Sequence, residues 1–325
     1  MFKNILITGG AGYIGSHIAE TLIKKNKNIV IIDNLSTGYK ELINKKAKFY
    51  KIDILNTQKT KEIIIKNKID SVIHLAGSLI IGIGEKYPDL YYKNNVLGTK
   101  SILSACKSTL IKNFIFSSTA AVYKDNQMVV NEGSKIKPKS VYGKTKLNAE
   151  KLVISFCKKI KIKYAILRYF NVCGASTSGK IGPITKTDSL FKNISSVVMK
   201  RKPTIKIYGN DYNTPDGTTI RDYIHVSDLA EVHYKVLNKI MKSNKSVIVN
   251  CGYYKGTSVK EVINEFKRQT KIKFIVLLQK RRVGDLAIVI ANNNKLKKTI
   301  NWRPKYSKLS TIVKSCIQWE KKSHN

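Results

Sequence analysis

The strongest constraint on this chain is the glycine-rich stretch that follows its first β-branched run. Thr8–Gly15 reads Thr-Gly-Gly-Ala-Gly-Tyr-Ile-Gly. Glycines at positions 9, 12 and 15 remove side chains where a tight turn meets a phosphate, and the following helix offers its unpaired N–H groups to that phosphate. Asp33 follows Gly15 by eighteen residues, where a carboxylate can bind ribose hydroxyls and repel a 2′-phosphate. The stretch therefore predicts a βαβ unit that binds NAD.

Short apolar runs alternate with longer helical patterns along the first half of the chain. The runs that we expect to be strands are Asn4–Thr8, Ile29–Asp33, Lys48–Lys51, Ser71–Leu75, Asn113–Ser117 and Tyr164–Arg168. The stretches that we expect to be helices are Ile14–Lys25, Lys59–Lys66, Leu90–Ser108 and Val141–Lys159. Most runs are apolar throughout, which is typical of strands covered on both faces. We predict an α/β fold with a Rossmann-type, doubly wound parallel sheet.

Beyond about residue 172 the alternation breaks, and a smaller α/β substrate lobe is expected. Here we expect a loop-rich section over Asn171–Asp188, helices at Leu190–Lys200, Ser227–Met241, Val259–Thr270 and Leu309–Lys321, a strand at Ile205–Tyr208, a long loop to Asp222, and a returning strand at Val247–Asn250. Residues 1–172, with a returning segment at about 224–250, are predicted to form the NAD-binding domain. Residues 173–223 and 251–325 are predicted to form the C-terminal lobe.

The formal net charge of +39 limits the classes of partner. Only seven of the 60 cationic residues are arginines, and the lysines are spread over the whole chain. No basic stripe interleaved with aromatic residues and no helix-turn-helix or finger pattern is present. We therefore expect a solvated lysine-rich surface without a specific nucleic-acid partner, with polyanion binding as the alternative. A positive field would also attract the pyrophosphate of a nucleotide.

Cysteine, histidine and hydropathy patterns argue against several other classes. The five cysteines are scattered and form no Cys-x-x-Cys pair, so neither a disulfide framework nor a zinc site is indicated. The five histidines have no ligand spacing, and no metal is expected; they are His17, His74, His225, His233 and His324. No run approaches the roughly 18 apolar residues of a membrane span, and the first strand leaves no room for a signal peptide. We expect a cytoplasmic protein with no membrane partner.

Tyr142 and Lys146 stand four residues apart on an expected helix, so they share one face. A free tyrosine titrates near pH ~10. A nearby ammonium and the positive nicotinamide ring favour the phenolate, which could then act as a general base. In a chain with 17 tyrosines such a pair can also be accidental. A hydroxyl-rich strand end that includes Thr119, about twenty positions earlier, favours the catalytic interpretation.

Together these motifs resemble those of the extended short-chain dehydrogenases/reductases, over essentially the whole chain. The resemblance implies a catalytic triad of Thr119, Tyr142 and Lys146, in which the threonine hydroxyl binds the substrate oxygen. Asp33–Gly38 resembles the family's ribose loop, and Leu75–Leu79 the segment that passes the cofactor phosphates and ribose. The positions implied to contact NAD are Gly9, Gly12, Tyr13, Ile14, Gly15, Asp33, Asn34, Leu35, Ser36, Thr37, Gly38, Asp53, Ile54, Leu75, Ala76, Gly77, Ser78, Leu79, Asn94, Tyr142, Lys146 and Phe170.

Two segments of the second half are similar to the UDP-sugar-binding segments of the family's epimerase branch, namely 167–175 and 208–226. Arg221 matches a residue that grips the pyrophosphate, a task suited to the guanidinium fork. Arg282 matches a phosphate contact, and Asp285 a contact to the uridine ribose. The implied substrate positions are Thr119, Tyr142, Asn171, Ser189, Arg221, Arg282, Asp285 and Val289.

The resemblance implies an isomerase that interconverts UDP-galactose and UDP-glucose through a 4-keto intermediate, with tightly bound NAD. Val289 stands where a bulkier residue in some relatives excludes N-acetylated sugars, so UDP-N-acetylglucosamine, alone or in addition, is the alternative. Ser189 stands where the family often has asparagine or histidine. Related dehydratases carry Asp-Glu where this chain has Ala120 and Ala121, which disfavours that chemistry.

Two further expectations concern assembly and catalytic competence. A non-catalytic nucleotide-binding member is the alternative from a different class, favoured by the +39 charge. Such a protein would be expected to have lost Tyr142 or Lys146, and this chain retains both. The family precedent implies a homodimer that packs two helices from each subunit, here Leu90–Ser108 and Val141–Lys159.

Overall fold

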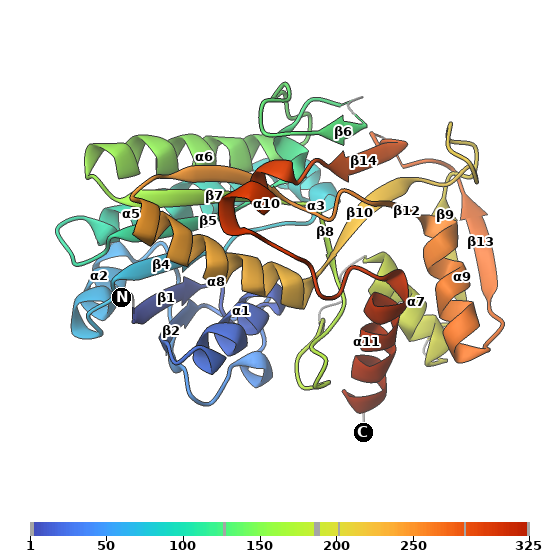
Figure 1. Cartoon of the computed structure of the whole chain (residues 1–325), viewed down its shortest axis with the longest axis horizontal. Coiled ribbons are helices and arrows are strands. Elements are labelled where there is room, and N and C mark those ends of the chain that lie inside the picture. The colour runs from blue at the N-terminus through green and yellow to red at the C-terminus, as the bar shows by residue number, and fades with distance from the viewer. Residues whose placement is uncertain (1–2, 126–127, 185–188, 201, 283, 324–325) are drawn as a thin grey trace.

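The main sheet of the protein has seven strands, and all neighbouring strands run parallel. The computed structural model describes residues 3–125, 128–184, 189–200, 202–282 and 284–323. The strand order is β11-β7-β5-β4-β1-β2-β3 (Figure 1). These strands are β1 (Asn4–Thr8), β2 (Asn28–Asp33), β3 (Lys48–Lys51), β4 (Ser71–His74), β5 (Asn113–Thr119), β7 (Lys163–Tyr169) and β11 (Val247–Cys251). The predicted doubly wound sheet is confirmed, and the returning strand joins it beside β7.

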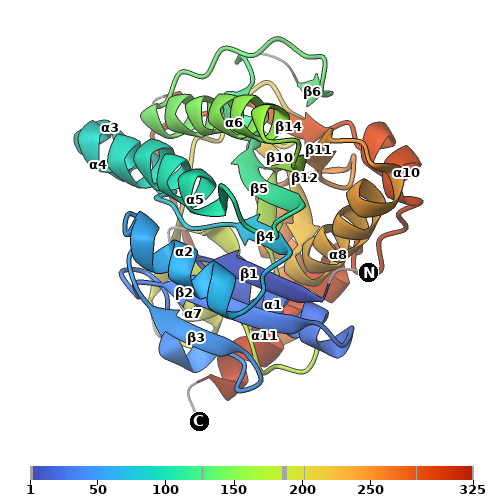
Figure 2. The same cartoon turned by 90° about the vertical axis from the view of Figure 1, so that its left-hand side faces the viewer.

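Helices cover both faces of this sheet because its strands carry apolar side chains on both. Helices α1 (Tyr13–Lys24) and α8 (Val226–Ser243) pack against the face that carries Ile5 and Ile7. On the opposite face, Leu6 belongs to the cluster that contains α2 (Thr57–Lys66), α5 (Gly98–Cys106) and α6 (Val141–Lys159). Figure 2 shows α2, α5 and α6 on one side of the sheet and α1 and α8 on the other.

The helix predicted over Leu90–Ser108 is interrupted. It consists of α4 (Pro88–Tyr91), a π-helical segment η2 (Tyr92–Leu97) and α5. π-Helical turns in otherwise regular helices occur frequently at functional sites. Here the wider turn holds Asn94 and Asn95, whose side chains bond to Ser78. Helical periodicity alone did not reveal this break.

The second half builds two smaller sheets beside the main one. The first has the order β12-β10-β14-β6 with β8 paired to β10, and the second pairs β9 with β13. The remaining strands are β6 (Val129–Val130), β8 (Asn171–Cys173), β9 (Thr204–Tyr208), β10 (Ile220–His225), β12 (Gly256–Ser258), β13 (Ile275–Gln279) and β14 (Ile288–Ala291). The remaining helical segments are η1 (Lys40–Leu42), α3 (Ile81–Lys86), η3 (Ala120–Val122), α7 (Leu190–Val198), α9 (Val259–Thr270), α10 (Asn294–Ile300) and α11 (Leu309–Lys322).

Two stretches predicted to be loops therefore contain strands. Strand β8 lies within the expected loop Asn171–Asp188, and β10 begins within the expected loop before Asp222. The two strands pair with each other in parallel, with Tyr223 opposite Asn171. Strand β8 has three residues, β10 has polar residues at its start, and the partner of each is distant in sequence, so neither has a strong local signal. Residues 185–188 of the expected loop lie outside the described part of the chain.

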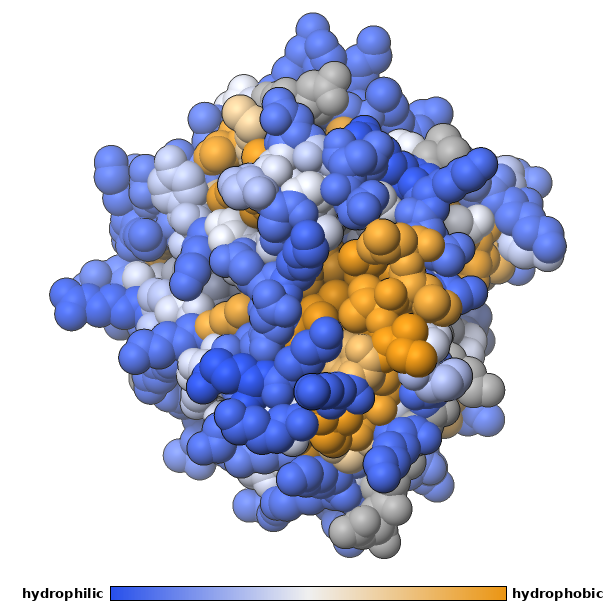
Figure 3. Space-filling view, turned by 90° about the vertical axis from the view of Figure 1, so that its right-hand side faces the viewer, coloured by the Kyte–Doolittle hydropathy of each residue, from blue (hydrophilic) through white to orange (hydrophobic). Residues whose placement is uncertain are grey.

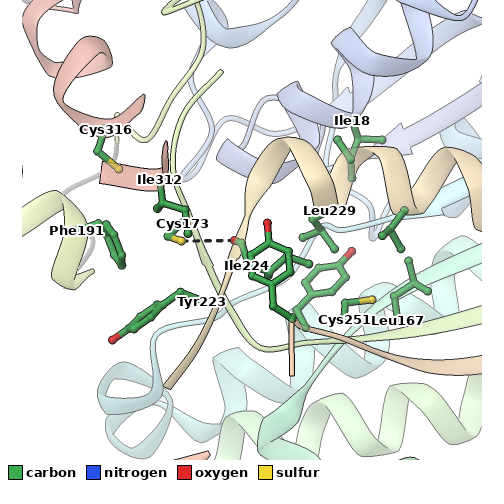
Figure 4. Packing of buried hydrophobic residues seen from close by; sticks show 14 of the residues in the cluster. Ile18, Leu167, Cys173, Phe191, Tyr223, Ile224, Leu229, Cys251, Ile312 and Cys316 are labelled. Carbon is green, nitrogen blue, oxygen red and sulfur yellow. Dashed lines mark hydrogen bonds between the residues drawn. The ribbon is translucent and has the colours of Figure 1, made fainter. Parts of the chain in front are cut away.

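One apolar cluster contains side chains from both predicted domains. Figure 4 shows Ile18 of α1 and Leu229 of α8 in the same cluster as Phe191 of α7 and Cys316 of α11. The Cys173 thiol donates a hydrogen bond of 3.5 Å to the carbonyl oxygen of Ile224 within it. Interiors packed in this way are dense and resist relative movement of their parts. The two predicted domains thus share a core.

The surface is mostly polar, in agreement with the lysine-rich composition. Figure 3 shows one large apolar patch interrupting it, on the side of the molecule where β13 lies. Strand β13 exposes Ile275, Leu277 and Leu278, at 61%, 38% and 56% of their surface. Among the residues that the structure describes, no helix is both long and apolar enough to span a bilayer.

Candidate active site

The segments predicted to bind cofactor and substrate meet at one edge of the main sheet. Thr8 of β1 lies beside His74 of β4, which in turn lies beside Phe116 of β5. Thr119 at the end of β5 lies beside Tyr169 of β7. Because these strands are parallel, their carboxyl ends share one edge, which is where ligands bind in open α/β sheets.

The glycine turn after β1 forms a cradle without side chains. Gly9 has a φ of +72°, and a Cβ atom there would lie 2.7 Å from the backbone nitrogen of Ala76. A Cβ atom on Gly15 would lie 2.3 Å from the carbonyl oxygen of Gly9. Gly12 is the N-cap residue of α1, and no side chain caps this helix. The exposed N-terminus of α1 therefore suits the pyrophosphate of a dinucleotide.

Asp33 organises the loop predicted to bind the adenosine ribose. Its carboxylate accepts hydrogen bonds from the backbone amides of Ala11 (3.0 Å) and Leu35 (2.9 Å). A carboxylate has about four acceptor positions, so capacity remains for ribose hydroxyls. Asp53 is a second acidic residue implied to contact NAD. It is joined to this loop, because the side-chain amide of Asn34 donates a hydrogen bond of 3.0 Å to the Asp53 carboxylate.

The other cofactor candidates of the N-terminal half divide into exposed and buried positions. Ser36 and Thr37 are exposed in the loop after Asp33. Ile54 is buried in the core, where it leaves no room for a side chain on Gly98. The Tyr13 hydroxyl donates to the carbonyl oxygen of Gly174 at 2.5 Å, which links the glycine turn to the second half of the chain. The other candidates in these segments, namely Ile14 and Gly38, are half-buried.

Asn95 is a residue of this site that the sequence prediction missed. It is 2% exposed, accepts a hydrogen bond of 2.7 Å from the Ser78 amide and donates one of 3.1 Å to the Ser78 carbonyl oxygen. It also donates to the Thr145 hydroxyl at 3.0 Å. The predicted neighbour Asn94 donates to the Ser78 hydroxyl at 2.8 Å. Asn95 thereby connects the Leu75–Leu79 segment to α6. The two adjacent asparagines within a predicted helix are the sequence feature that could have indicated this role.

Thr119, Tyr142 and Lys146 lie together where β5 ends and α6 begins. Thr119 lies close enough to Tyr142 for its side chain to act on the pKa of the Tyr142 phenol. Ser140 caps α6 by accepting from the amide of Gly143 at 3.0 Å. A Cβ atom on Gly143 would lie 2.3 Å from the carbonyl oxygen of Ala121. Only glycine at this position therefore lets α6 approach the backbone of η3 this closely. The structure thus brings the predicted triad together.

Burial dominates the electrostatics of this triad. It raises the pKa of Tyr142 to about 12, although the polar side chain of Thr119 acts in the opposite direction. It lowers the pKa of Lys146 to about 7, although the charge of Glu150 acts in the opposite direction. The Lys146 ammonium lies 4.4 Å from the centre of the Phe116 ring. In the protein without bound cofactor, burial disfavours the charged form of both groups. The expectation that Lys146 and a nicotinamide ring together favour the phenolate stays a prediction.

The residues predicted to hold the UDP group gather around β10 and β14. Arg221 forms an ion pair with Asp285 and donates to the carbonyl oxygen of Ile220 at 2.9 Å. Val289 lies directly beside Arg221 in the sheet. Arg282 and Asp285 are joined by a backbone hydrogen bond: the Asp285 amide donates to the Arg282 carbonyl oxygen at 3.1 Å. The sequence prediction did not anticipate that Arg221 and Asp285 bind each other.

The remaining substrate candidates lie on neighbouring elements. Asn171 is exposed at the start of β8, and Ser189 is the N-cap residue of α7, where its side chain makes no capping bond. Phe170 packs in a small buried cluster. Tyr208 was not among the candidates, although it begins the 208–226 motif. Its ring lies 3.9 Å from the guanidinium of Arg282.

Burial holds the described histidines in their neutral form. Burial lowers the pKa of His74 and His225 to about 3, and of His17 and His233 to about 4. His324 lies outside the described residues. No group of three or more His, Cys, Asp or Glu residues within the described chain could hold a metal ion.

Comparisons with known proteins agree with this geometry. The NAD dependent epimerase/dehydratase family matches residues 5–252. The UDP-glucose 4-epimerase of Lactobacillus helveticus is 36% identical over 319 residues, covering 98% of this chain and 97% of that protein. A solved UDP-glucose-4-epimerase from Stenotrophomonas maltophila, with bound NAD and formylated UDP-arabinopyranose, is 30% identical with a TM-score of 0.95 and covers 99% of both chains. The UDP-Glc/GlcNAc 4-epimerase of Campylobacter jejuni is 37% identical with a TM-score of 0.85, over 98% of this chain and 99% of that chain.

A substitution at Gly9 tests the cradle. Gly9→Ala should lower the free energy of unfolding by at least about 1–2 kcal/mol, because alanine at a positive φ is strained and its methyl group would press against Ala76. It should also reduce the NAD that copurifies with the protein. The matched control is Gly82→Ala, since a Cβ atom there meets nothing within 4 Å. Equal melting temperatures and equal NAD contents for the two variants would contradict this account of the turn.

Proposed function

Because this chain belongs to the NAD-dependent epimerase/dehydratase family, we propose that it is an isomerase that interconverts UDP-galactose and UDP-glucose through a 4-keto intermediate. The observation that carries the proposal is the proximity of Thr119 and Tyr142 at the sheet edge that also carries the glycine cradle. Sequence identities of 36% and 38% to two UDP-glucose 4-epimerases, each over 98% of this chain, support the same activity. The activity belongs to galactose metabolism.

Tyr142 is the proposed general base. It takes the proton from the sugar 4-hydroxyl while Thr119 holds the same oxygen, and it returns the proton when the keto group is reduced. NAD, when bound, supplies the acceptor and donor of hydride and a cationic ring. Since burial raises the pKa of Tyr142 to about 12, added positive charge is needed to favour the phenolate. Lys146 contributes to this only when it is protonated.

The proposed cofactor site fits NAD. The turn formed by Gly9, Gly12 and Gly15 leaves space at the N-terminus of α1 for the pyrophosphate. Asp33 suits the adenosine ribose and disfavours the 2′-phosphate of NADP. The overall reaction neither oxidises nor reduces the substrate, so the cofactor is regenerated in every cycle and can remain bound.

Arg221, Arg282 and Asp285 are proposed to hold the UDP group. The two arginines bind the pyrophosphate, and Asp285 binds the uridine ribose. Because Arg221 and Asp285 form an ion pair in the protein alone, Arg221 must exchange or share this partner when the nucleotide binds. Asn171 is proposed as a further contact to the nucleotide-sugar. Firm binding at the UDP end leaves the hexose free to turn, so that the hydride returns to the opposite face of carbon 4.

The second candidate substrate is UDP-N-acetylglucosamine. Val289 lies beside Arg221 in the sheet and has a small side chain. We propose that it leaves room for a 2-acetamido group, as the wider specificity in the name of the C. jejuni relative illustrates for that protein. A dehydratase is disfavoured because Ala120 and Ala121 offer neither an acid nor a base. A non-catalytic role is disfavoured because Tyr142 and Lys146 are retained.

The first test is an assay with two substrates and no added NAD. Purified protein is incubated separately with UDP-galactose and with UDP-N-acetylgalactosamine, and the products are separated by chromatography. We expect conversion of UDP-galactose to UDP-glucose, because the cofactor should remain bound through purification. Conversion of both substrates would make the enzyme dual-specific. Failure with both, even after NAD is added, would contradict the proposed function.

The second test removes the proposed base. Tyr142→Phe should lower kcat for UDP-galactose by about 10²- to 10⁴-fold, the usual contribution of general acid–base catalysis, while the affinity for UDP changes little. Tyr254→Phe is the matched control, because the Tyr254 side chain is 47% exposed. Unchanged turnover in Tyr142→Phe would eliminate the phenol as the base.

We also propose that two copies associate as a homodimer through the helical segments 90–108 and 141–159. Leu90, Tyr92 and Leu97 expose 46%, 47% and 40% of their surface in the first of these segments. Apolar side chains gathered on one surface are typical of association sites.

The proposed location is the cytoplasm, which suits the five buried free cysteines.

Sedimentation tests the proposed homodimer. The wild-type protein should sediment with twice the mass of the 36.7 kDa chain, and Leu97→Glu should sediment as a monomer because a buried carboxylate is costly. Leu110→Glu is the control, since Leu110 is 63% exposed outside these helices. A monomeric wild-type protein, or a Leu97→Glu variant that still dimerises, would exclude this interface.

A further inference from the structure

A buried ion pair lies among the elements that carry the proposed triad. Glu150 and Arg168 are each 2% exposed. The guanidinium binds both carboxylate oxygens, with Nη2 to Oε2 at 2.7 Å and Nε to Oε1 at 3.0 Å. Such two-pronged pairing is the strongest form of this interaction. Neither residue was a candidate in the sequence, and the proposed chemistry has not yet used either.

This ion pair joins three elements of the site. Ser118, the neighbour of Thr119 on β5, donates to the Glu150 carboxylate at 2.5 Å. Arg168 lies on β7, two residues before Phe170, and directly beside Ser118 in the sheet. Glu150 lies on α6. One carboxylate therefore connects the strand that ends in Thr119, the helix that carries Tyr142, and the strand that leads to the substrate segment.

The hydrogen bonds continue from Arg168 into the next strand. Its Nη1 donates to the Tyr123 hydroxyl at 3.1 Å, and that hydroxyl donates to the Asn250 side chain at 2.7 Å. Asn250 lies on β11, directly beside Arg168, and is fully buried. The polar groups of this buried network satisfy one another, as a network in a low-dielectric interior requires.

Glu150 also shares a helix face with the proposed catalytic residues. Tyr142, Lys146 and Glu150 follow one another at intervals of one helical turn. The elements around Lys146 carry several titratable or charged groups, among them Tyr142 and Glu150 on α6, His74 on β4, Arg168 and Tyr169 on β7, Tyr91 on α4, Lys93 on η2 and Glu85 on α3. Burial keeps the pKa of His74 at about 3, so this histidine is neutral at physiological pH. Glu150 is the carboxylate of this set whose charge acts on Lys146.

We propose that Glu150 is the positioning residue of this site: through Ser118 and Arg168 it holds β5, α6 and β7 together, and its charge favours the cationic form of Lys146 one turn from Tyr142. The consequence for turnover rests on the proposed function, because it assumes that Tyr142 is the base. The effect on Lys146 itself does not depend on any substrate.

The sign of the electrostatic effect follows from the two opposing influences on Lys146. Burial lowers the pKa of Lys146 to about 7, and the negative charge of Glu150 acts to raise it. Without that charge the pKa of Lys146 falls further, so a smaller fraction of Lys146 is cationic at physiological pH. A neutral amine cannot favour the Tyr142 phenolate.

The decisive experiment follows the ionisation of Lys146 directly. Protein carrying [ε-¹³C]lysine is titrated by NMR, and the Lys146 resonance is assigned by its loss in Lys146→Arg. In Glu150→Gln the midpoint of this resonance should move to lower pH by about one unit, the smallest shift usual for a nearby charge. Glu150→Asp retains the charge and should return the midpoint toward the wild-type value. A residue that served only to hold the fold together would not move this midpoint.

Two further variants separate the electrostatic effect from loss of folding. Glu150→Gln/Arg168→Met removes the pair without leaving a buried unpaired guanidinium. Because it removes one charge of each sign, its midpoint should lie between that of Glu150→Gln and the wild-type value. Glu320→Gln is the matched control, because Glu320 is 1% exposed and ion-paired with Lys192 on other helices. It should leave the Lys146 midpoint unchanged. A wild-type midpoint in folded Glu150→Gln would overturn the proposal.

The pH dependence of kcat then distinguishes failure of the proposed function from failure of the proposed role of Glu150. If the proposed function holds, the high-pH limb of kcat for UDP-galactose should move to lower pH in Glu150→Gln, together with the NMR midpoint. If the wild-type protein converts no UDP-sugar, the proposed function fails while the NMR result still stands. If turnover is present and the midpoint does not move, only the role of Glu150 fails.

Discussion

The close approach of the turn after β1 to the turn after β4 is the constraint on which the site depends. Gly9 permits it, since any side chain there would meet the backbone of Ala76. The neighbouring Gly77 has the same importance, because a Cβ atom on it would lie 2.6 Å from the Asn95 side chain. Asn95 in turn bonds to Thr145 on α6. The backbone that cradles a dinucleotide is therefore linked by successive contacts to the helix that carries the proposed base.

Burial favours the neutral forms of the titratable side chains in this site when no ligand is present. Both Tyr142 and Lys146 are shifted toward their neutral forms, and the described histidines are neutral as well. The permanent charges nearby are largely paired, as Glu150 is with Arg168 and Arg221 is with Asp285. A ligand that brings charge into such a low-dielectric region has a larger effect than it would in water. The protein thereby makes the ionisation of one phenol depend on what is bound beside it.

Sequence reasoning found the elements whose signal is local. The predicted bounds of β1, β3, α6 and α9 agree with the structure, because each has a clear apolar pattern. It missed β8, β14 and the π-helical turn, because these depend on partners far away in the sequence. The same distinction applies to the site. Gly9, Asp33 and Tyr142 stand in recognisable spacings, whereas the roles of Asn95 and Glu150 arise only when Ser78, Thr145 and Arg168 are brought to them.

The exposed strand β13 gives the unusual charge of this protein a physical consequence. It lies in a two-stranded sheet and exposes Ile275, Leu277 and Leu278, and an apolar strand of this kind is a template for unwanted pairing between molecules. Lys273 and Lys280 flank it, in the manner of gatekeeper residues. With +39 on every copy, long-range repulsion keeps these strands apart in dilute salt. At about 1 M salt the Debye length falls to roughly 3 Å, which screens this repulsion and the gatekeeper charges with it, so the exposed strand becomes freer to pair between molecules.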